Sequence, residues 1–165
     1  MSAEMRNRSR NCVAAVLVTV VVALATTLAT ALATPAFAQI SLPTMELTAG
    51  FHRLQAEVAA TPEHRAVGLM HRQTMPAQHG MLFVFTHTSR HCMWMRNTLL
   101  PLSVAFLDEK GVIINIEDMQ PKTETNHCAA KDARYALEMN LGWFKAKGVA
   151  PGMVITGVER APAGR

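Results

Sequence analysis

The densest group of chemically useful side chains in this 165-residue chain is Trp94-Met95-Arg96-Asn97-Thr98. It combines an aromatic face, a guanidinium group and two hydrogen-bonding side chains. Strand alternation would put Trp94, Arg96 and Thr98 on one face. Because aromatic faces with a few polar groups orient small ligands, these three and Asn97 are candidate contacts for a planar or saccharide-like ligand. The alternative is structural: Met95 fills the core, and Asn97 and Thr98 shape a turn.

Three further charged residues are candidates for the same binding site. Arg65 and Arg72 are seven residues apart, so a helix that continued that far would carry both on one face, as an anion clamp or as a solvated surface. Glu138 should point opposite to Leu137 in a strand and, if buried, needs a cationic partner or a raised pKa. We expect either an Arg65–Glu138 ion pair or a site carboxylate. In the second case Glu138, or a histidine, could be the acid or base of an envelope enzyme acting on a saccharide or peptide.

One dipeptide occurs twice, as His91-Cys92 and His127-Cys128. Thiolate and imidazole ligands suit Cu(I) or Zn, so these four residues are the alternative metal site of a periplasmic copper- or zinc-binding protein. Two buried free thiols are another alternative. We predict a disulfide between Cys92 and Cys128, because an even pair of cysteines in an oxidising compartment is most simply a bridge. No nucleophile triad, zinc-protease pattern or phosphate loop is present, and no cofactor is expected.

The prediction of an oxidising compartment comes from the start of the chain. Arg6, Arg8 and Arg10 precede an apolar run over residues 12–33, and Ala36-Phe37-Ala38 ends it. This order is typical of a signal peptide over residues 1–38, with a mature protein that begins at Gln39. Because the run approaches the length that spans a bilayer, an uncleaved anchor is the alternative. We expect a periplasmic or secreted protein with no membrane span after cleavage.

The charge balance argues against a nucleic-acid partner. The chain has 16 Lys and Arg residues, of which three lie in the predicted leader, and 12 Asp and Glu residues, of which one lies there. The mature chain therefore keeps 13 basic and 11 acidic residues. No basic run occurs along it. The expected partner is therefore a small molecule or an envelope protein, and the expected state is a monomer.

The elements that must position these residues are short. We predict a tether at 39–44 and one domain at 45–160, long enough for a single core. Alternation and turn residues predict strands at 45–47, 51–58, 81–85, 91–95, 102–107, 112–116, 134–139 and 153–158. Helices are predicted from Thr61-Pro62 to about residue 70, and over 143–147 after an Asn140 cap. The fold class is mainly β (α+β), a compact antiparallel β sandwich or barrel with two short helices.

Several segments together resemble domain-of-unknown-function family 192. They are Arg65–Arg72, Gly80–Phe85, Trp94–Leu102, Met119–Pro121 and Tyr135–Glu138, and the resemblance extends from about Leu54 to Val158. It implies a compact, mostly β domain that is often exported in bacteria, and it implies no reaction. The chain departs from the family pattern at His64, where an acid is frequent, and at Ser103, where Asp is frequent.

From these observations we predict an exported small β domain of unknown molecular role, a ligand- or partner-binding accessory protein of the cell envelope. The candidate contacts are Arg65, Arg72, Trp94, Arg96, Asn97, Thr98 and Glu138.

Overall fold

The structure is a computed structural model that describes residues 42–165. The predicted leader and the first part of the predicted tether lie outside the described residues. In chain order the elements are β1 (Thr44–Ala49), β2 (His52–Ala59), α2 (Pro62–Val67), β3 (His79–Ser89), β4 (Cys92–Met93), β5 (Leu102–Leu107), β6 (Ile113–Met119), β7 (His127–Cys128), β8 (Ala133–Asn140), α3 (Trp143–Ala146), β9 (Ile155–Thr156) and a 3-10 helix, η1 (Val158–Arg160).

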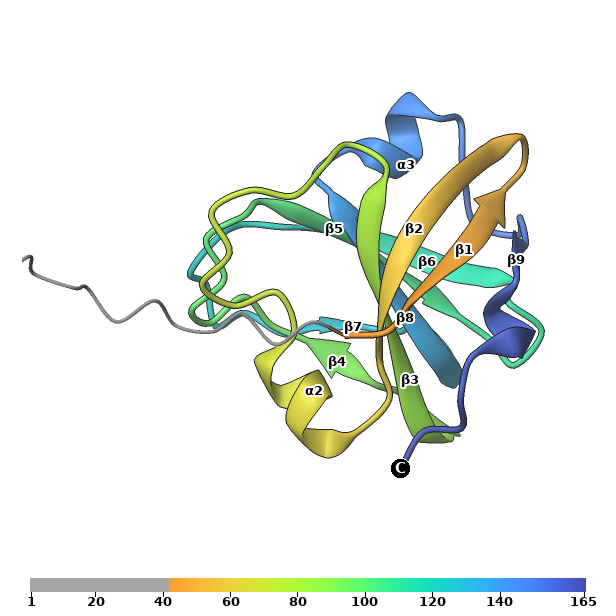
Figure 1. The fold of residues 1–165 in the computed structure, drawn as a ribbon, viewed down its shortest axis with the longest axis horizontal. Coiled ribbons are helices and arrows are strands. Elements are labelled where there is room, and N and C mark those ends of the chain that lie inside the picture. Colours follow the sequence, from red (N-terminus) through yellow and green to blue (C-terminus); the bar gives the residue numbers. More distant parts are fainter. Residues whose placement is uncertain (1–41) are drawn as a thin grey trace, which may run out of the picture. The chain divides into compact units, whose positions relative to one another are not determined.

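Seven strands form one curled sheet in the order β6-β5-β8-β3-β2-β1-β9, and β4 and β7 form a separate two-stranded ribbon (Figure 1). The predicted mainly β fold with two short α-helices is confirmed for the described residues. One pair departs from the predicted antiparallel arrangement, because β2 and β3 run parallel. A parallel pair needs a crossover connection, and the segment containing α2 supplies it.

The two ends of the sheet are joined by the segment before β9. β9 pairs with β1 through Thr156 and Ile155. The same segment bonds the start of β6, where the Ile113 amide donates to the Met153 carbonyl over 2.8 Å and Gly152 donates back to Ile113 over 2.8 Å. The curled sheet therefore closes at one end into a half-barrel, which protects part of its edges from pairing with other chains.

The central strands are apolar on both faces. All six residues of β5 are buried, and β3 alternates between two hydrophobic clusters. Leu82 and Val84 face the first core, which also holds Trp143 and Phe144 of α3. The opposite face carries the second core, covered by residues that follow α2, β4 and β7: Leu69, Met95, Leu100 and Ala129. Strands that are buried on both sides need such a second covering layer.

Local sequence signals predicted most of the strands and both α-helices, with ends that differ from the observed ones by up to four residues. The hairpin predicted over 102–116 is β5 and β6, and Thr61 caps α2 by accepting the His64 amide over 3.2 Å. That helix ends earlier than predicted, at Val67, because Gly68 takes a positive φ of 49° as its cap. The last predicted strand is shorter, since β9 covers two residues and η1 follows.

The predicted Asn140 cap of α3 is wrong. Gly142 is the N-cap of that helix, and as a glycine it supplies no side-chain cap. The Asn140 amide donates instead to the carbonyls of Met75 and Pro76, over 3.3 and 3.1 Å. The Asn140 side chain, which local sequence predicted as a helix cap, therefore makes a long-range contact to the loop before β3.

We predict that Gly111→Ala destabilises the fold more than Gly148→Ala. Both glycines have positive φ, 78° and 65°. A Cβ at Gly111 would lie 2.5 Å from the Ile155 carbonyl oxygen at the closure of the barrel, whereas Gly148 has open space around it. The left-handed backbone alone should cost about 1 kcal/mol at Gly148, and the added clash should raise the loss at Gly111 to about 3 kcal/mol. Urea unfolding of both variants measures the difference, and equal losses would contradict the closure argument.

Candidate functional site

The cysteines lie on an arm that is separate from the seven-stranded sheet. The arm is defined here as residues 90–98 and 120–130, whose centres are β4 and β7. Cys92 pairs directly with Cys128 across the ribbon, and a disulfide joins them across a sequence separation of 36. The predicted disulfide is confirmed.

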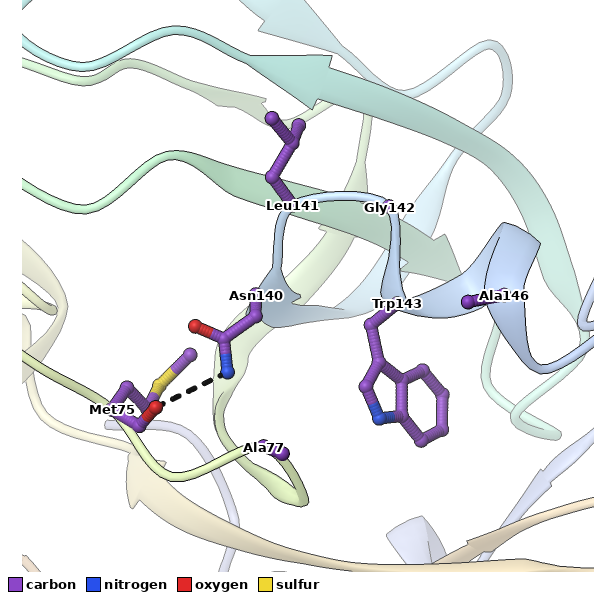
Figure 2. Close-up of a pocket in the computed structure, with 7 residues that line it drawn as sticks. All are labelled: Met75, Ala77, Asn140, Leu141, Gly142, Trp143 and Ala146. Carbon is purple, nitrogen blue, oxygen red and sulfur yellow. Dashed lines mark hydrogen bonds between the residues drawn. The ribbon is translucent and has the colours of Figure 1, made fainter.

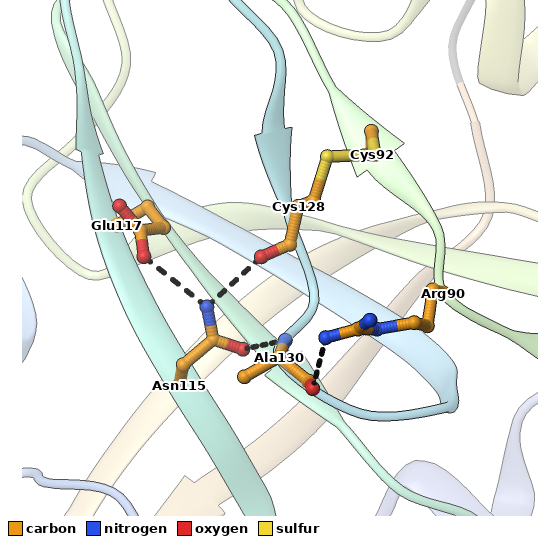
Figure 3. Close-up of a disulfide and its surroundings, with 6 residues drawn as sticks. All are labelled: Arg90, Cys92, Asn115, Glu117, Cys128 and Ala130. Atoms are coloured by element: carbon orange, nitrogen blue, oxygen red, sulfur yellow. Dashed lines mark hydrogen bonds between the residues drawn. A yellow bond between two sulfur atoms is a disulfide. The ribbon is translucent and has the colours of Figure 1, made fainter.

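Polar contacts at the base of the arm connect it to β6 (Figure 3). The Asn115 amide donates to the Cys128 carbonyl over 3.1 Å and accepts the Ala130 amide over 2.9 Å. Within the arm itself, Arg90 donates to the Ala130 carbonyl over 2.7 Å and so joins its two segments. Met95 and Ala129 are buried in the second core, so the arm is anchored by one apolar residue from each of its segments.

The predicted alternation of Trp94, Arg96 and Thr98 on one strand face is wrong. The chain leaves β4 after Met93 and turns at Arg96 and Asn97. Asn97 has a positive φ of 59°, and the Thr98 amide donates to Met95 over 3.0 Å. Thr98 is therefore buried, while Trp94 and Arg96 remain at the surface.

Trp94 and Arg96 nevertheless form one exposed group. Trp94 is 45% exposed, and the Arg96 guanidinium carbon lies 5.7 Å from the centre of its ring. Glu124, from the other segment of the arm, lies 3.8 Å from Arg96. An aromatic surface, a cation and a carboxylate thus meet at the surface, a combination that can stack on a ligand and bond its hydroxyls. Sequence reasoning missed Glu124, because it lies in a polar loop without any periodic pattern.

Three loops meet beside this group, and each has a non-glycine residue in the left-handed region. These residues are His71, Asn97 and Lys122, with φ of 63°, 59° and 60°. The His71 amide donates to the Asn97 carbonyl over 3.0 Å, and the Lys122 amide donates to the Thr98 carbonyl over 3.1 Å. Such backbone conformations are held only by well-determined surroundings and are frequent at functional sites.

Arg65 stabilises the backbone instead of pairing with Glu138. Its guanidinium group donates to the carbonyls of Ala60, Val84 and Arg165 over 2.8, 2.9 and 2.8 Å. The predicted Arg65–Glu138 pair is therefore wrong. An arginine fork can satisfy several carbonyls at once, which local sequence does not reveal.

Arg72 lies beyond α2, so the prediction that it shares a helix face with Arg65 is also wrong. It forms a two-pronged ion pair with Glu57 of β2, in which Nη2 and Oε2 are 2.7 Å apart. Both side chains are largely shielded, with exposed fractions of 12% and 21%. Bidentate pairs of this kind hold a fixed geometry, and the guanidinium is occupied.

Glu138 is enclosed in the middle of the sheet. It lies opposite Met81 of β3 and Val104 of β5, both of them second-core residues, so its side chain shares their face. It is 3% exposed, and its cross-strand neighbours on both sides are apolar. Burial alone raises the pKa of Glu138 to about 8, so the group is mostly protonated at neutral pH.

Ser103, the position that departs from the family pattern, bridges β6 and the start of α3. Its hydroxyl donates to the Asp118 carboxylate and accepts the Gly142 amide over 2.8 Å. The carboxylate in this network comes from the neighbouring strand, a partner that sequence reasoning did not identify.

Three of the four residues of the alternative metal site have other roles in the structure. The disulfide consumes both thiols. The His91 ring stacks on Phe85 at 3.7 Å, and its Nε2 donates to the His87 carbonyl over 2.9 Å. Among the described residues, no group of three or more His, Cys, Asp or Glu side chains is arranged to hold a metal ion.

A shallow depression of about 370 Å³ lies away from the arm. Figure 2 shows it between the loop at Met75 and Ala77 and the segment from Asn140 to Ala146. The Trp143 indole lines it, but its N–H donates to Gln78 over 3.1 Å. Neither Trp94 nor Arg96 contributes to this depression. Within residues 42–165, no helix has the length and apolar character needed to cross a membrane.

The solved structures with a similar fold include two bacterial proteins. A Sinorhizobium meliloti protein, provisionally described as a transcription regulator, is 36% identical, with a TM-score of 0.69 over 73% of this chain and 98% of its own. A Novosphingobium aromaticivorans protein of unknown function is 32% identical, with a TM-score of 0.68 over 75% of this chain and 93% of its own. No curated protein matches the chain.

A family model agrees with these structural similarities and with the resemblance seen in the sequence. The model described as "Uncharacterized ACR" matches residues 44–157, which is most of the described chain. The protein therefore belongs to the DUF192 family.

Proposed function

We propose that this protein is an exported binding protein of the cell envelope, which contacts its ligand through Trp94 and Arg96. The observation that carries the proposal is the exposed cation–π pair on the arm, with the guanidinium carbon 5.7 Å from the ring centre. Exposed tryptophan and arginine side chains dominate binding energy in many interfaces. Arg65 and Arg72 are not part of the proposed contact, since both are engaged elsewhere.

A saccharide fits the chemistry of this surface. The C–H face of a sugar ring can stack on the uncovered part of the Trp94 indole, which is 45% exposed. Arg96 and Glu124 supply a donor and an acceptor for hydroxyl groups at the edge of the ring. The description of the Sinorhizobium meliloti protein does not favour the same role here, because the mature charge is nearly balanced.

The sequence of the leader and the disulfide support export. The order of basic, apolar and small residues over residues 1–38 is typical of a cleaved signal. Disulfides persist mainly in oxidising compartments, and the Cys92–Cys128 bridge agrees with such a compartment.

We predict that oligosaccharides quench the fluorescence of Trp94. The probes are tetramers of N-acetylglucosamine, maltose-type glucose and galacturonic acid, titrated into a Trp143→Phe protein in which Trp94 is the remaining tryptophan of the described chain. In calorimetry with the wild-type background, Trp94→Ala should weaken binding about tenfold or more, because it removes the stacking face.

The matched control is Leu141→Ala, which removes an apolar side chain that is 40% exposed outside the arm and should leave affinity unchanged. If none of the three tetramers binds, or if Trp94→Ala binds as well as wild type, the saccharide proposal fails. If Trp94 instead binds an envelope protein, the partner is a protein and the saccharide proposal fails.

Export has its own test. Expression of the full chain in a bacterium with fractionation should give a periplasmic protein that starts at Gln39 by intact mass, with a Cys92–Cys128 bridge that resists alkylation until reduced. Recovery of the uncleaved chain in the cytosol would contradict the proposal.

The buried Glu138 favours a second candidate, an envelope enzyme that acts on a saccharide or peptide. A carboxyl group with a pKa of about 8 can give or accept a proton near neutral pH. It ranks second because the depression near Trp143 is lined by neither Glu138 nor Trp94.

We predict that Glu138 makes folding stability depend on pH. Its pKa rises from 4.5 in the unfolded chain to about 8 in the folded one. The folded state therefore binds the extra proton in this window, and stability should fall as pH rises, by up to about 1.4 kcal/mol per pH unit. Glu138→Gln should remove this decline.

Urea unfolding of both proteins from pH 5 to pH 8.5 measures the effect. The control variant is Glu117→Gln. Glu117 lies in β6 and pairs with Val104 from the side away from Glu138, so the variant removes a different carboxylate of the same sheet. Parallel pH curves for wild type and Glu138→Gln would show that Glu138 does not titrate in this window.

A further inference from the structure

We propose that the Cys92–Cys128 disulfide is a thiol–disulfide exchange site, at which a dithiol reductant releases the arm while the barrel stays folded. Both cysteines are exposed, so a thiolate can approach either sulfur. One consequence rests on the proposed function: opening of the arm would separate the segments that carry Arg96 and Glu124 and weaken ligand binding.

The position of the bridge makes a local opening possible. Cys92 and Cys128 face each other in a ribbon that has two residue pairs and no strand in common with the seven-stranded sheet. The ladder hydrogen bonds of the barrel therefore do not pass through the arm. Structural units with few buried contacts open first and independently of the core.

A small set of contacts besides the bridge joins the arm to the rest of the domain. Asn115 bonds the arm backbone at exposed positions, where water competes for the same groups. The His71 amide donates to the Asn97 carbonyl, and the His91 ring stacks on Phe85. Met95 and Ala129 are its fully buried apolar anchors. A disulfide disfavours the open arm by restricting the loop between residues 92 and 128, so removing the bridge shifts the balance toward opening.

The exchange requires one dithiol and transfers two electrons. A thiolate of the reductant attacks one sulfur of the bridge, forms a mixed disulfide and releases the other cysteine as a thiolate, which takes up a proton. The second thiol of the reductant then displaces the attached cysteine, leaving two protein thiols and an oxidised, disulfide-bonded reductant. The adjacent His127 points to the opposite side of its strand from Cys128, so the site depends on exposure and not on a neighbouring imidazole.

The first experiment compares reduction rates. Dithiothreitol is added to the native protein and to the urea-unfolded protein, and new thiols are trapped with N-ethylmaleimide and counted by mass. An accessible bridge should be reduced in the native state within about tenfold of its rate in the unfolded chain. A native rate that equals the rate of global unfolding would overturn the proposal.

The second experiment asks what opens. Arg96 and Lys122 are trypsin sites within the arm, and Arg53 of β2 is a matched site within the barrel. After reduction, and in the Cys92→Ser/Cys128→Ser variant, cleavage at Arg96 and Lys122 should accelerate about tenfold or more. Cleavage at Arg53 and the far-ultraviolet circular dichroism should stay unchanged.

Unchanged cleavage of the arm, or cleavage at Arg53 together with Arg96, would overturn the inference, because the bridge would then have no effect or would brace the whole fold. None of these measurements uses a ligand. A failure of saccharide binding therefore leaves the exchange site intact, and a failure of arm opening leaves the binding proposal intact.

Discussion

The burial of both faces of the central strands is the constraint on which the rest of the structure depends. β3, β5 and β8 carry apolar side chains on alternate sides, and each side packs into its own cluster. A single curled sheet can bury one face inside the half-barrel, but the other face needs separate cover. That cover comes from the residues after α2, from the arm and from Leu100. Hydrophobic burial therefore holds these irregular parts of the chain in place.

This covering layer determines where chemistry is available. Met95 packs into the second core, and its neighbours Trp94 and Arg96 are thereby presented to solvent. Glu138 lies on the covered face between Met81 and Val104, which explains both its burial and its raised pKa. One layer thus produces an exposed aromatic–cation pair outside and a neutral carboxyl group inside. The first suits recognition of a ligand, and the second suits proton transfer.

The arm combines a covalent brace with exposure to solvent. A ribbon with two residue pairs is too small to be stable alone, and the disulfide between directly opposed cysteines compensates for its missing strands. Trp94 and both cysteines are exposed on the same arm. The proposed binding surface and the proposed exchange site are therefore parts of one element.

Short sequence patterns predicted the structure correctly where interactions between neighbouring residues determine it. The Thr61-Pro62 helix start, the turn residues between the strands predicted at 102–107 and 112–116, and the even pair of cysteines each predicted what the structure contains. Contacts between distant segments could not be predicted in the same way. Arg65 donates to three carbonyls, and Arg72 pairs with Glu57. Glu138 lies between Met81 and Val104 of the neighbouring strands. Partner choice for a charged side chain depends on which groups burial brings within about 3 Å, and only the folded arrangement of β2, β3, β5 and β8 decides that.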